Sequence, residues 1–234
     1  MASQTDWLRT HVRQVHMDFH MPEFPLKAIK NFDAKAFVDH LERGRVNMVA
    51  LFAKCHFGNS FYNTVVGHKH SGLPNDFLRE AAEECRKRDI KTTAYYSLCC
   101  DRRAYENYPH WRAMKADGEP LPISGPWGRV CVNTPYREEL VLPQLEEIAR
   151  DYPVDGYFID IPCVPECFCK YCQQKFQLMY GRELTSAVPG VERRAFIQNS
   201  CGRFLRELRG ICARHNPDLR IMTNQAWSIR TART

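Results

Sequence analysis

Short apolar runs alternate with longer amphipathic stretches along this chain. The runs are rich in β-branched and aromatic residues, and polar residues bound them, so each predicts a buried strand. They cover residues 15–19, 46–53, 90–97, 154–161 and 219–223. Strands that alternate with helices form a parallel sheet with right-handed crossovers. The pattern therefore predicts an α/β fold.

The stretches between the runs carry helix signals. Asp33 is placed to cap the first helix, and Asn75 or Asp76 the second, each before a face of apolar residues. The third stretch contains Pro143, which predicts a kink. The fourth predicts a long helix through residues 196–211, whose apolar positions recur at helical spacing.

Two architectures fit this alternation, an open doubly wound sheet and a (β/α)8 barrel. No glycine-rich phosphate loop follows any of the runs, which removes the usual support for the first. Polar residues stand at the carboxyl ends of the strands instead, where parallel barrels carry their chemistry. They are Asp18, His20, Lys54, His56, Tyr95, Tyr96, Ser97, Asp160 and Asn224.

The sequence has fewer apolar runs than a closed barrel has strands. A closed barrel takes eight strands and about 250 residues, and this chain has 234 residues with five runs. We expect a TIM barrel truncated after about five βα units. No repeat or linker divides the sequence, so residues 1–234 are expected to be one partial barrel domain without a second domain.

Composition excludes several classes of protein. The chain is 44% hydrophobic and 26% charged, as in globular proteins, and no apolar stretch is long enough for a membrane span. Its net charge of +6 is spread among acidic residues, so a mixed surface is favoured over nucleic-acid binding. The polar start resembles no secretory signal, and we expect a cytoplasmic protein with no membrane or nucleic-acid partner.

Three of the 11 cysteines form a Cys-x-Cys-x-x-Cys motif at Cys167, Cys169 and Cys172. A loop that enters a helix can turn three thiols toward one tetrahedral zinc ion, which then needs a fourth ligand. Free thiols in a crowded loop are the alternative. The candidates for the fourth ligand are Cys163, Cys99, Cys100 and Cys131.

Asp160 ends the fourth apolar run, so the strand delivers one carboxylate to its carboxyl tip. A buried structural aspartate is the alternative. Lys54, His56, Tyr96 and Trp127 add the hydrogen-bonding and aromatic groups that a sugar site needs. Glycoside hydrolysis takes two carboxyl groups. Glu23 and Glu166 are the candidate partners, although each is more often a solvated loop residue.

Four segments together resemble the hypothetical glycosyl hydrolase 6 family, whose barrel is related to the α-L-fucosidases of glycoside hydrolase family 29 and the β-galactosidases of family 42. The resemblance covers residues 12–225. Its segments are 109–118, 128–138, 154–160 and 167–172.

The two related families imply different details. Residues 54–59 are similar to the Lys-His-His-Asp-Gly-Phe loop of family 29, with departures at Cys55, Phe57 and Asn59, and Asp160 falls where that family has its nucleophile. In family 42 the fourth strand supplies the acid/base instead. That family also has a zinc site of the same kind, and the match makes Cys131 the fourth ligand.

The resemblance implies a glycosidase, fucosidase- or galactosidase-like, that hydrolyses O-glycosidic bonds with retention. Asp160 would be the nucleophile, and structural zinc would bind Cys131, Cys167, Cys169 and Cys172. The residues expected to bind the sugar are His16, Asp18, His20, Lys54, His56, Tyr96, Trp127 and Asn224.

Two other functions remain as alternatives. One is a carbohydrate-binding or structural fragment without activity, and the other is a zinc-dependent hydrolase. The sequence has no His-Glu-x-x-His motif, and four thiolates leave no open metal position, which disfavours the zinc-dependent hydrolase. The expected partners are a carbohydrate substrate and either a second copy of the chain or the missing part of the barrel.

Overall fold

A computed structural model describes residues 7–23, 31–122, 125–162 and 166–224. The strands are Gln14–His16 (β1), Met48–Lys54 (β2), Asn59–Ser60 (β3), His68–Lys69 (β4), Lys91–Ser97 (β5), Gly156–Asp160 (β6) and Arg220–Thr223 (β7). The α-helices are Ala34–Arg43 (α1), Phe77–Arg86 (α2), Arg102–Asn107 (α3), Leu142–Asp151 (α4), Lys170–Tyr180 (α5) and Gly190–His215 (α6).

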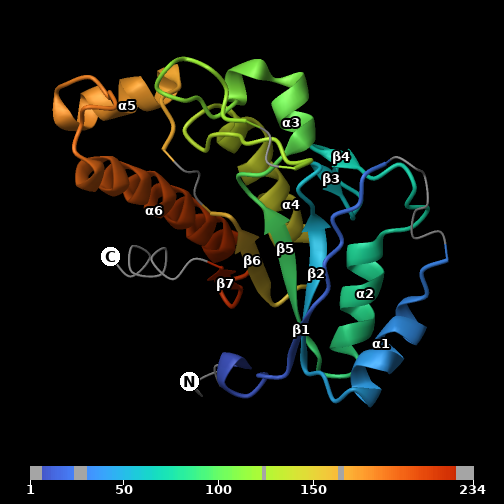
Figure 1. Ribbon diagram of the computed structural model, residues 1–234. Coiled ribbons are helices and arrows are strands. Elements are labelled where there is room, and N and C mark those ends of the chain that lie inside the picture. Colours follow the sequence, from blue (N-terminus) through green and yellow to red (C-terminus); the bar gives the residue numbers. More distant parts are fainter. Residues whose placement is uncertain (1–6, 24–30, 123–124, 163–165, 225–234) are drawn as a thin grey trace.

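All seven strands belong to one sheet. β1, β2, β5, β6 and β7 lie side by side in that order, and every neighbouring pair among them is parallel. The short β3 pairs antiparallel with the end of β2, and β4 pairs with β3. Figure 1 shows the sheet with α1 and α2 beyond the β2 side and α6 beyond the β7 side. The five parallel strands confirm the predicted arc of βα units.

The predicted helix caps are confirmed for α1 and α2. The carboxylate of Asp33 accepts a hydrogen bond from the Ala36 N–H at 2.9 Å. Of the two candidates for the second cap, Asp76 holds the position and accepts from the Arg79 N–H at 3.2 Å. Each cap satisfies an N–H that the helix cannot pair internally.

The predicted kink at Pro143 falls in the first turn of α4, directly after an irregular turn. A π-helical turn, Arg137–Val141, runs directly into α4. Pro143 has no N–H to donate one turn back, and a widened turn accommodates the missing bond. The helix then continues to Asp151 and buries Leu145 and Ile148.

The two faces of the sheet differ. On the inner face the rings of Phe52, Tyr95 and Phe158 form a row across β2, β5 and β6, with centroids 3.9 Å and 6.0 Å apart. His16 of β1 meets all three rings edge-on. On the outer face the Tyr157 hydroxyl donates to the Leu145 carbonyl of α4 at 2.7 Å. The helices cover this outer face, as in a barrel.

Some elements were not expected from the sequence. β3, β4 and α3 are short segments in the loops that follow β2 and β5. β3 pairs with the end of β2, β4 pairs with β3, and the Arg102 N–H of α3 donates to the His56 carbonyl at 2.9 Å. None of the helices in the described residues is long and apolar enough to cross a membrane.

Candidate functional site

Asp160 is the last residue of β6 and lies in register with Ser97, the last residue of β5. One carboxylate oxygen accepts a hydrogen bond from the Tyr95 hydroxyl, and the other accepts from the Asn224 side-chain amide. The side chain is only 12% exposed. Two donors on opposite oxygens fix the direction of the carboxylate.

Burial and the charge of Asp160 together raise the pKa of Tyr95. Its hydroxyl therefore stays protonated and remains a donor to Asp160. The sequence places Tyr95 among the strand-end residues but not among those expected to bind the sugar. The period of two along a strand could have identified it, because Tyr95 and Ser97 share one face.

Two imidazoles stand beside the carboxylate. His56 Nε2 lies 3.5 Å from Asp160 Oδ2, and His56 Nδ1 lies 2.5 Å from Ser97 Oγ. The His20 ring stacks on His56 with centroids 3.8 Å apart. Burial, followed by the charges of His20, Lys54 and Arg129, lowers the pKa of His56 to about 3. His56 is therefore neutral at physiological pH.

The rim of the site holds several more of the expected residues. The Trp127 ring lies 4.9 Å from that of His56 and 5.1 Å from that of His20. Asp18 is exposed, and its Oδ1 lies 3.4 Å from His20 Nε2. His16 is exposed on the inner face of β1. The structure thus gathers His16, Asp18, His20, His56, Trp127 and Asn224 around Asp160.

Lys54 and Tyr96 lie elsewhere, contrary to the expectation from sequence. The Lys54 ammonium is fully buried 2.8 Å from the Asp101 carboxylate, and it also donates to the Tyr136 hydroxyl at 3.0 Å. The Tyr96 hydroxyl donates to Gln144 Oε1 at 2.9 Å. Both side chains are enclosed by the fold and are not exposed to a ligand.

An irregularity in β2 is the reason for the position of Lys54. The register between β2 and β5 shifts after Phe52, so that Phe52 pairs with Tyr95 but Lys54 pairs with Tyr96. In a regular strand Phe52 and Lys54 would share the inner face. The extra residue turns Lys54 to the opposite face, where its ammonium lies 4.9 Å from the centre of the Tyr96 ring.

The backbone is strained immediately after Asp160. Ile161 has a φ of 48°, a left-handed conformation that is unfavourable for a β-branched residue. Its N–H donates to the Asn224 side-chain oxygen at 3.2 Å. Strain of about 1–3 kcal/mol persists only where surrounding contacts enforce it, and such positions cluster at functional sites.

The two candidate partner carboxylates are bound to other groups. Glu23 accepts hydrogen bonds from His68 at 2.7 Å and from Arg103 at 2.8 Å. Burial alone would raise its pKa, but hydrogen bonds from Ser71 and His68 lower the pKa of Glu23 to about 2. A carboxyl group that is ionised above pH 2 cannot act as a general acid at neutral pH. Glu166 pairs with Arg193 at 2.9 Å.

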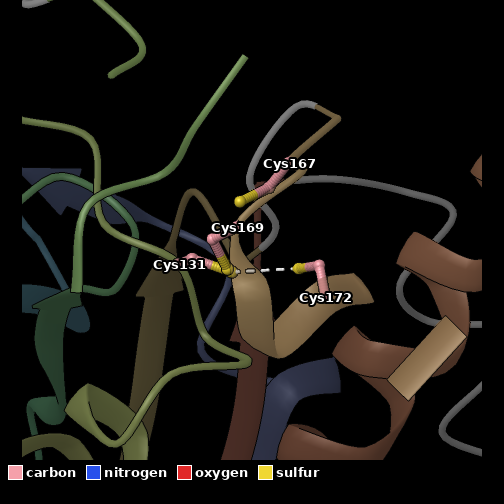
Figure 2. A group of neighbouring side chains, drawn as sticks. All are labelled: Cys131, Cys167, Cys169 and Cys172. Carbon is pink, nitrogen blue, oxygen red and sulfur yellow. Dashed lines mark hydrogen bonds between the residues drawn. The ribbon is translucent and has the colours of Figure 1, made fainter. Parts of the chain in front are cut away.

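The motif cysteines and Cys131 converge at one point, as Figure 2 shows. The sulfur atoms of Cys131, Cys167, Cys169 and Cys172 all lie within 4.8 Å of one another, and all four residues are buried. Four thiolates at about 2.3 Å from a tetrahedral ion would lie about 3.8 Å apart. The cluster can therefore hold a metal ion.

Backbone and side-chain donors surround these sulfur atoms. The Met114 N–H points at Cys167 Sγ and the Asn133 N–H at Cys131 Sγ, each at 3.4 Å. The Asn133 amide reaches Cys172 Sγ at 3.3 Å. Donors of this kind stabilise thiolates, which are the metal-binding form of cysteine.

Among the candidates for the fourth position, Cys131 joins the motif. Cys99 and Cys100 are buried outside the cluster, and Cys163 lies outside the described residues. A second group, His20, His56 and Asp160, also brings ligand atoms within 4.8 Å of one another. The same side-chain atoms also contact Tyr95, Asp18 and each other. Polar groups of this kind can bind sugar hydroxyls as well as a metal ion.

Comparison with protein families gives one match. The model of a family described as hypothetical glycosyl hydrolase 6 matches residues 33–161, from the cap of α1 to the residue after Asp160. That range is more than half of the chain. A comparison with curated proteins gave no match.

Solved structures with the same fold include glycosidases. An α-L-fucosidase, isoenzyme 2 from Paenibacillus thiaminolyticus, is 28% identical with a TM-score of 0.79, over 91% of this chain and 32% of the fucosidase. A β-galactosidase from Bacillus circulans sp. alkalophilus is 12% identical with a TM-score of 0.62, over 83% of this chain and 34% of the galactosidase. The chain thus spans about a third of the length of either enzyme. The arc of βα units is part of a TIM-barrel fold.

A third solved structure matches over most of the length of both proteins. A hypothetical protein from Ruminiclostridium thermocellum ATCC 27405 is 12% identical with a TM-score of 0.58, and the match covers 84% of this chain and 92% of that protein. At this identity the likeness concerns the fold alone.

Proposed function

Because the chain belongs to the hypothetical glycosyl hydrolase 6 family, we propose that it hydrolyses O-glycosidic bonds with retention and that Asp160 is the nucleophile. The observation that carries this proposal is the Asp160 carboxylate at the carboxyl end of β6, held by Tyr95 and Asn224. The 28% identity to an α-L-fucosidase supports a similar substrate.

In this reaction an Asp160 oxygen attacks the anomeric carbon while the bond from that carbon to the leaving oxygen breaks, and the leaving oxygen takes a proton from water. Water then cleaves the glycosyl ester and releases the sugar. Tyr95 and Asn224 hold the carboxylate in one orientation before the attack. The left-handed conformation of Ile161, which Asn224 holds through a hydrogen bond, fixes the end of β6, and β6 carries Asp160.

Sugar binding would use the groups on the rim. Trp127 offers an aromatic face for the apolar side of a sugar ring. His16, His20 and Asp18 are exposed or half-buried and can exchange hydrogen bonds with hydroxyl groups. Burial lowers the pKa of His56 to about 3, and its neutral imidazole can donate one hydrogen bond and accept another from sugar hydroxyls.

We propose zinc as the ion of the four-cysteine cluster, because four buried thiolates favour zinc and close its coordination. Bound zinc would supply a structural crosslink. Cys131 lies in the segment after β5, and the motif lies in the segment after β6, so the ion would join the two segments that border Asp160.

Covalent trapping tests the proposed nucleophile. A 2-deoxy-2-fluoro glycoside with a dinitrophenyl leaving group needs little acid assistance, so the attack by Asp160 is measured alone. We expect mass spectrometry to find one glycosyl group on the peptide that contains Asp160. Labelling of another carboxylate, or labelling that persists in Asp160→Asn, would contradict the assignment.

A second candidate is carbohydrate binding without hydrolysis. It is favoured by the positions of Glu23 and Glu166, each paired with a basic residue and neither contacting Asp160. This candidate predicts that the protein binds sugars but that the fluoro glycosides leave no covalent group on it.

A further inference from the structure

Arg129 lies in a short antiparallel ladder beyond the carboxyl end of β5. The Val130 N–H donates to the Cys99 carbonyl at 3.1 Å, and the Asp101 N–H donates to the Gly128 carbonyl at 2.9 Å. Between these bonds Arg129 pairs with Cys100. The Cys100 carbonyl accepts from Ser97 Oγ at 2.7 Å, and that oxygen is the one beside His56. The ladder thus borders the site around Asp160.

The packing of Gly128 shows which way its neighbours point. A Cβ on Gly128 would meet the Cβ of Tyr105 at 2.4 Å, so this side of the ladder lies against α3. Successive side chains in an extended segment point to opposite sides. Trp127 and Arg129 therefore point away from Tyr105, and the Trp127 ring contacts His20 and His56. Arg129 shares the side of the ladder that faces the site.

In the described residues Arg129 forms no ion pair with a carboxylate, unlike three other cations near this edge, Lys54, Arg102 and Arg103. Lys54 pairs with Asp101 at 2.8 Å, Arg103 with Glu23 at 2.8 Å, and Arg102 with Glu106 at 2.5 Å. Within the described parts of the chain no carboxylate lies within ion-pair distance of Arg129, which is half-buried. A partly buried cation is costly unless an anion accompanies it.

The chemistry of the guanidinium indicates what that anion is. Its planar fork binds a carboxylate or a sulfate through two parallel hydrogen bonds. Trp127 beside it can stack on the sugar ring that bears the acidic group. We propose that the sugar bound at this site is anionic, with a carboxylate or sulfate substituent that Arg129 binds. This inference rests on the proposed carbohydrate site, and it narrows the substrate to a fucose- or galactose-like sugar that carries an acidic group.

Titration of the full chain with monosaccharides, followed by NMR, tests the inference. The probes are galacturonate and galactose 6-sulfate, which separate the two acidic groups, with galactose and fucose as neutral sugars. Charged hydrogen bonds contribute about 1.5–3 kcal/mol, so at least one anionic sugar should bind roughly 10- to 100-fold more tightly than the neutral ones. In Arg129→Gln that ratio should fall to about one.

Arg206→Gln is the matched control. Arg206 is exposed on α6 and carries the same charge, so this variant should keep the ratio. If Arg129→Gln does not give a wild-type thermal transition, Arg129→Lys keeps the charge without the fork and should retain only part of the preference.

The outcomes separate the two proposals. Equal binding of neutral and anionic sugars, or a preference that survives in Arg129→Gln, would contradict the role of Arg129 and leave the glycosidase proposal standing. Binding of no sugar at all would contradict both.

Discussion

At the residue scale, the arrangement around Asp160 depends on which of two adjacent tyrosines faces it. Tyr95 donates to the carboxylate, whereas Tyr96 donates to Gln144 within the buried outer layer. A pair of neighbouring tyrosines in a sequence does not reveal which one faces a site. The alternation of the strand decides it once one inward residue is known.

We predict opposite consequences for the two tyrosines. Tyr95→Phe removes a hydrogen bond to a charged group, about 1.5–3 kcal/mol, so turnover should fall roughly 10- to 100-fold with little change in stability. Tyr96→Phe leaves the Gln144 oxygen without its donor, so stability should fall by about 1–3 kcal/mol. Kinetics and urea unfolding of both variants measure this, and the reverse pattern would contradict the geometry.

A pH dependence follows from His56. Burial, then the charges of His20, Lys54 and Arg129, lowers its pKa from 6.5 to about 3. Below pH 6.5 the unfolded chain binds a proton that folded His56 does not. Stability should therefore fall as the pH drops from about 6.5 toward 3, by up to about 1.4 kcal/mol per pH unit from this residue.

The variant His56→Gln isolates this contribution. Its free energy of unfolding should depend less on pH between about 6.5 and 3 than that of the wild type. His110→Gln, at an exposed histidine, is the control for replacing a histidine with glutamine. Parallel slopes for the wild type and His56→Gln in urea unfolding at several pH values would show that His56 titrates normally.

At the scale of elements, the sequence alone predicts the strands and helix ends that depend on nearby residues. The five parallel strands and the caps at Asp33 and Asp76 all follow from nearby residues. The bulge in β2 could not be predicted, because it depends on pairing with β5, and it moved Lys54 out of the site. β3 is equally non-local, since its pairing partner is the end of β2.

A metal ion bound by the four cysteines would connect two parts of the fold, α5 and the segment after β5. We expect about one zinc ion per chain in protein purified without added metal. Cys169→Ser combined with Cys172→Ser should lose it, whereas Cys85→Ser, at a buried thiol of α2, should not. Elemental analysis measures the content.

Removal of the metal should also change the dynamics of these elements. A structural ion contributes folding free energy, so a chelator should speed hydrogen exchange in α5 and around Cys131 first. Metal content that is unchanged in the double variant would contradict the cluster as the binding site.

At the scale of the whole molecule, the described part of the sheet leaves strand edges unpaired. In the described residues β1 pairs only with β2, and β7 pairs only with β6. Open edges present backbone donors and acceptors to other chains. The inner face is also uncovered, since His16 is exposed and Phe158 is half-buried. We therefore propose that the chain associates with a second copy or with a partner that completes the sheet.

Light scattering coupled to size exclusion measures this association. We expect a mass above the 27.3 kDa of one chain, and the fraction of associated protein should rise with protein concentration. A monomer of that mass with a cooperative thermal transition would mean that the chain protects its edges in another way.

The central claim is that Asp160 is the nucleophile of a glycosidase. The most direct measurement is the hydrolysis of dinitrophenyl glycosides by Asp160→Ala, with and without azide. We predict a fall in kcat/KM of at least about 10³-fold, partly restored by azide as a glycosyl azide forms, because azide can replace the missing carboxylate. Asp155→Asn, just before the same strand, should stay close to wild type. Wild-type turnover in Asp160→Ala would contradict the claim.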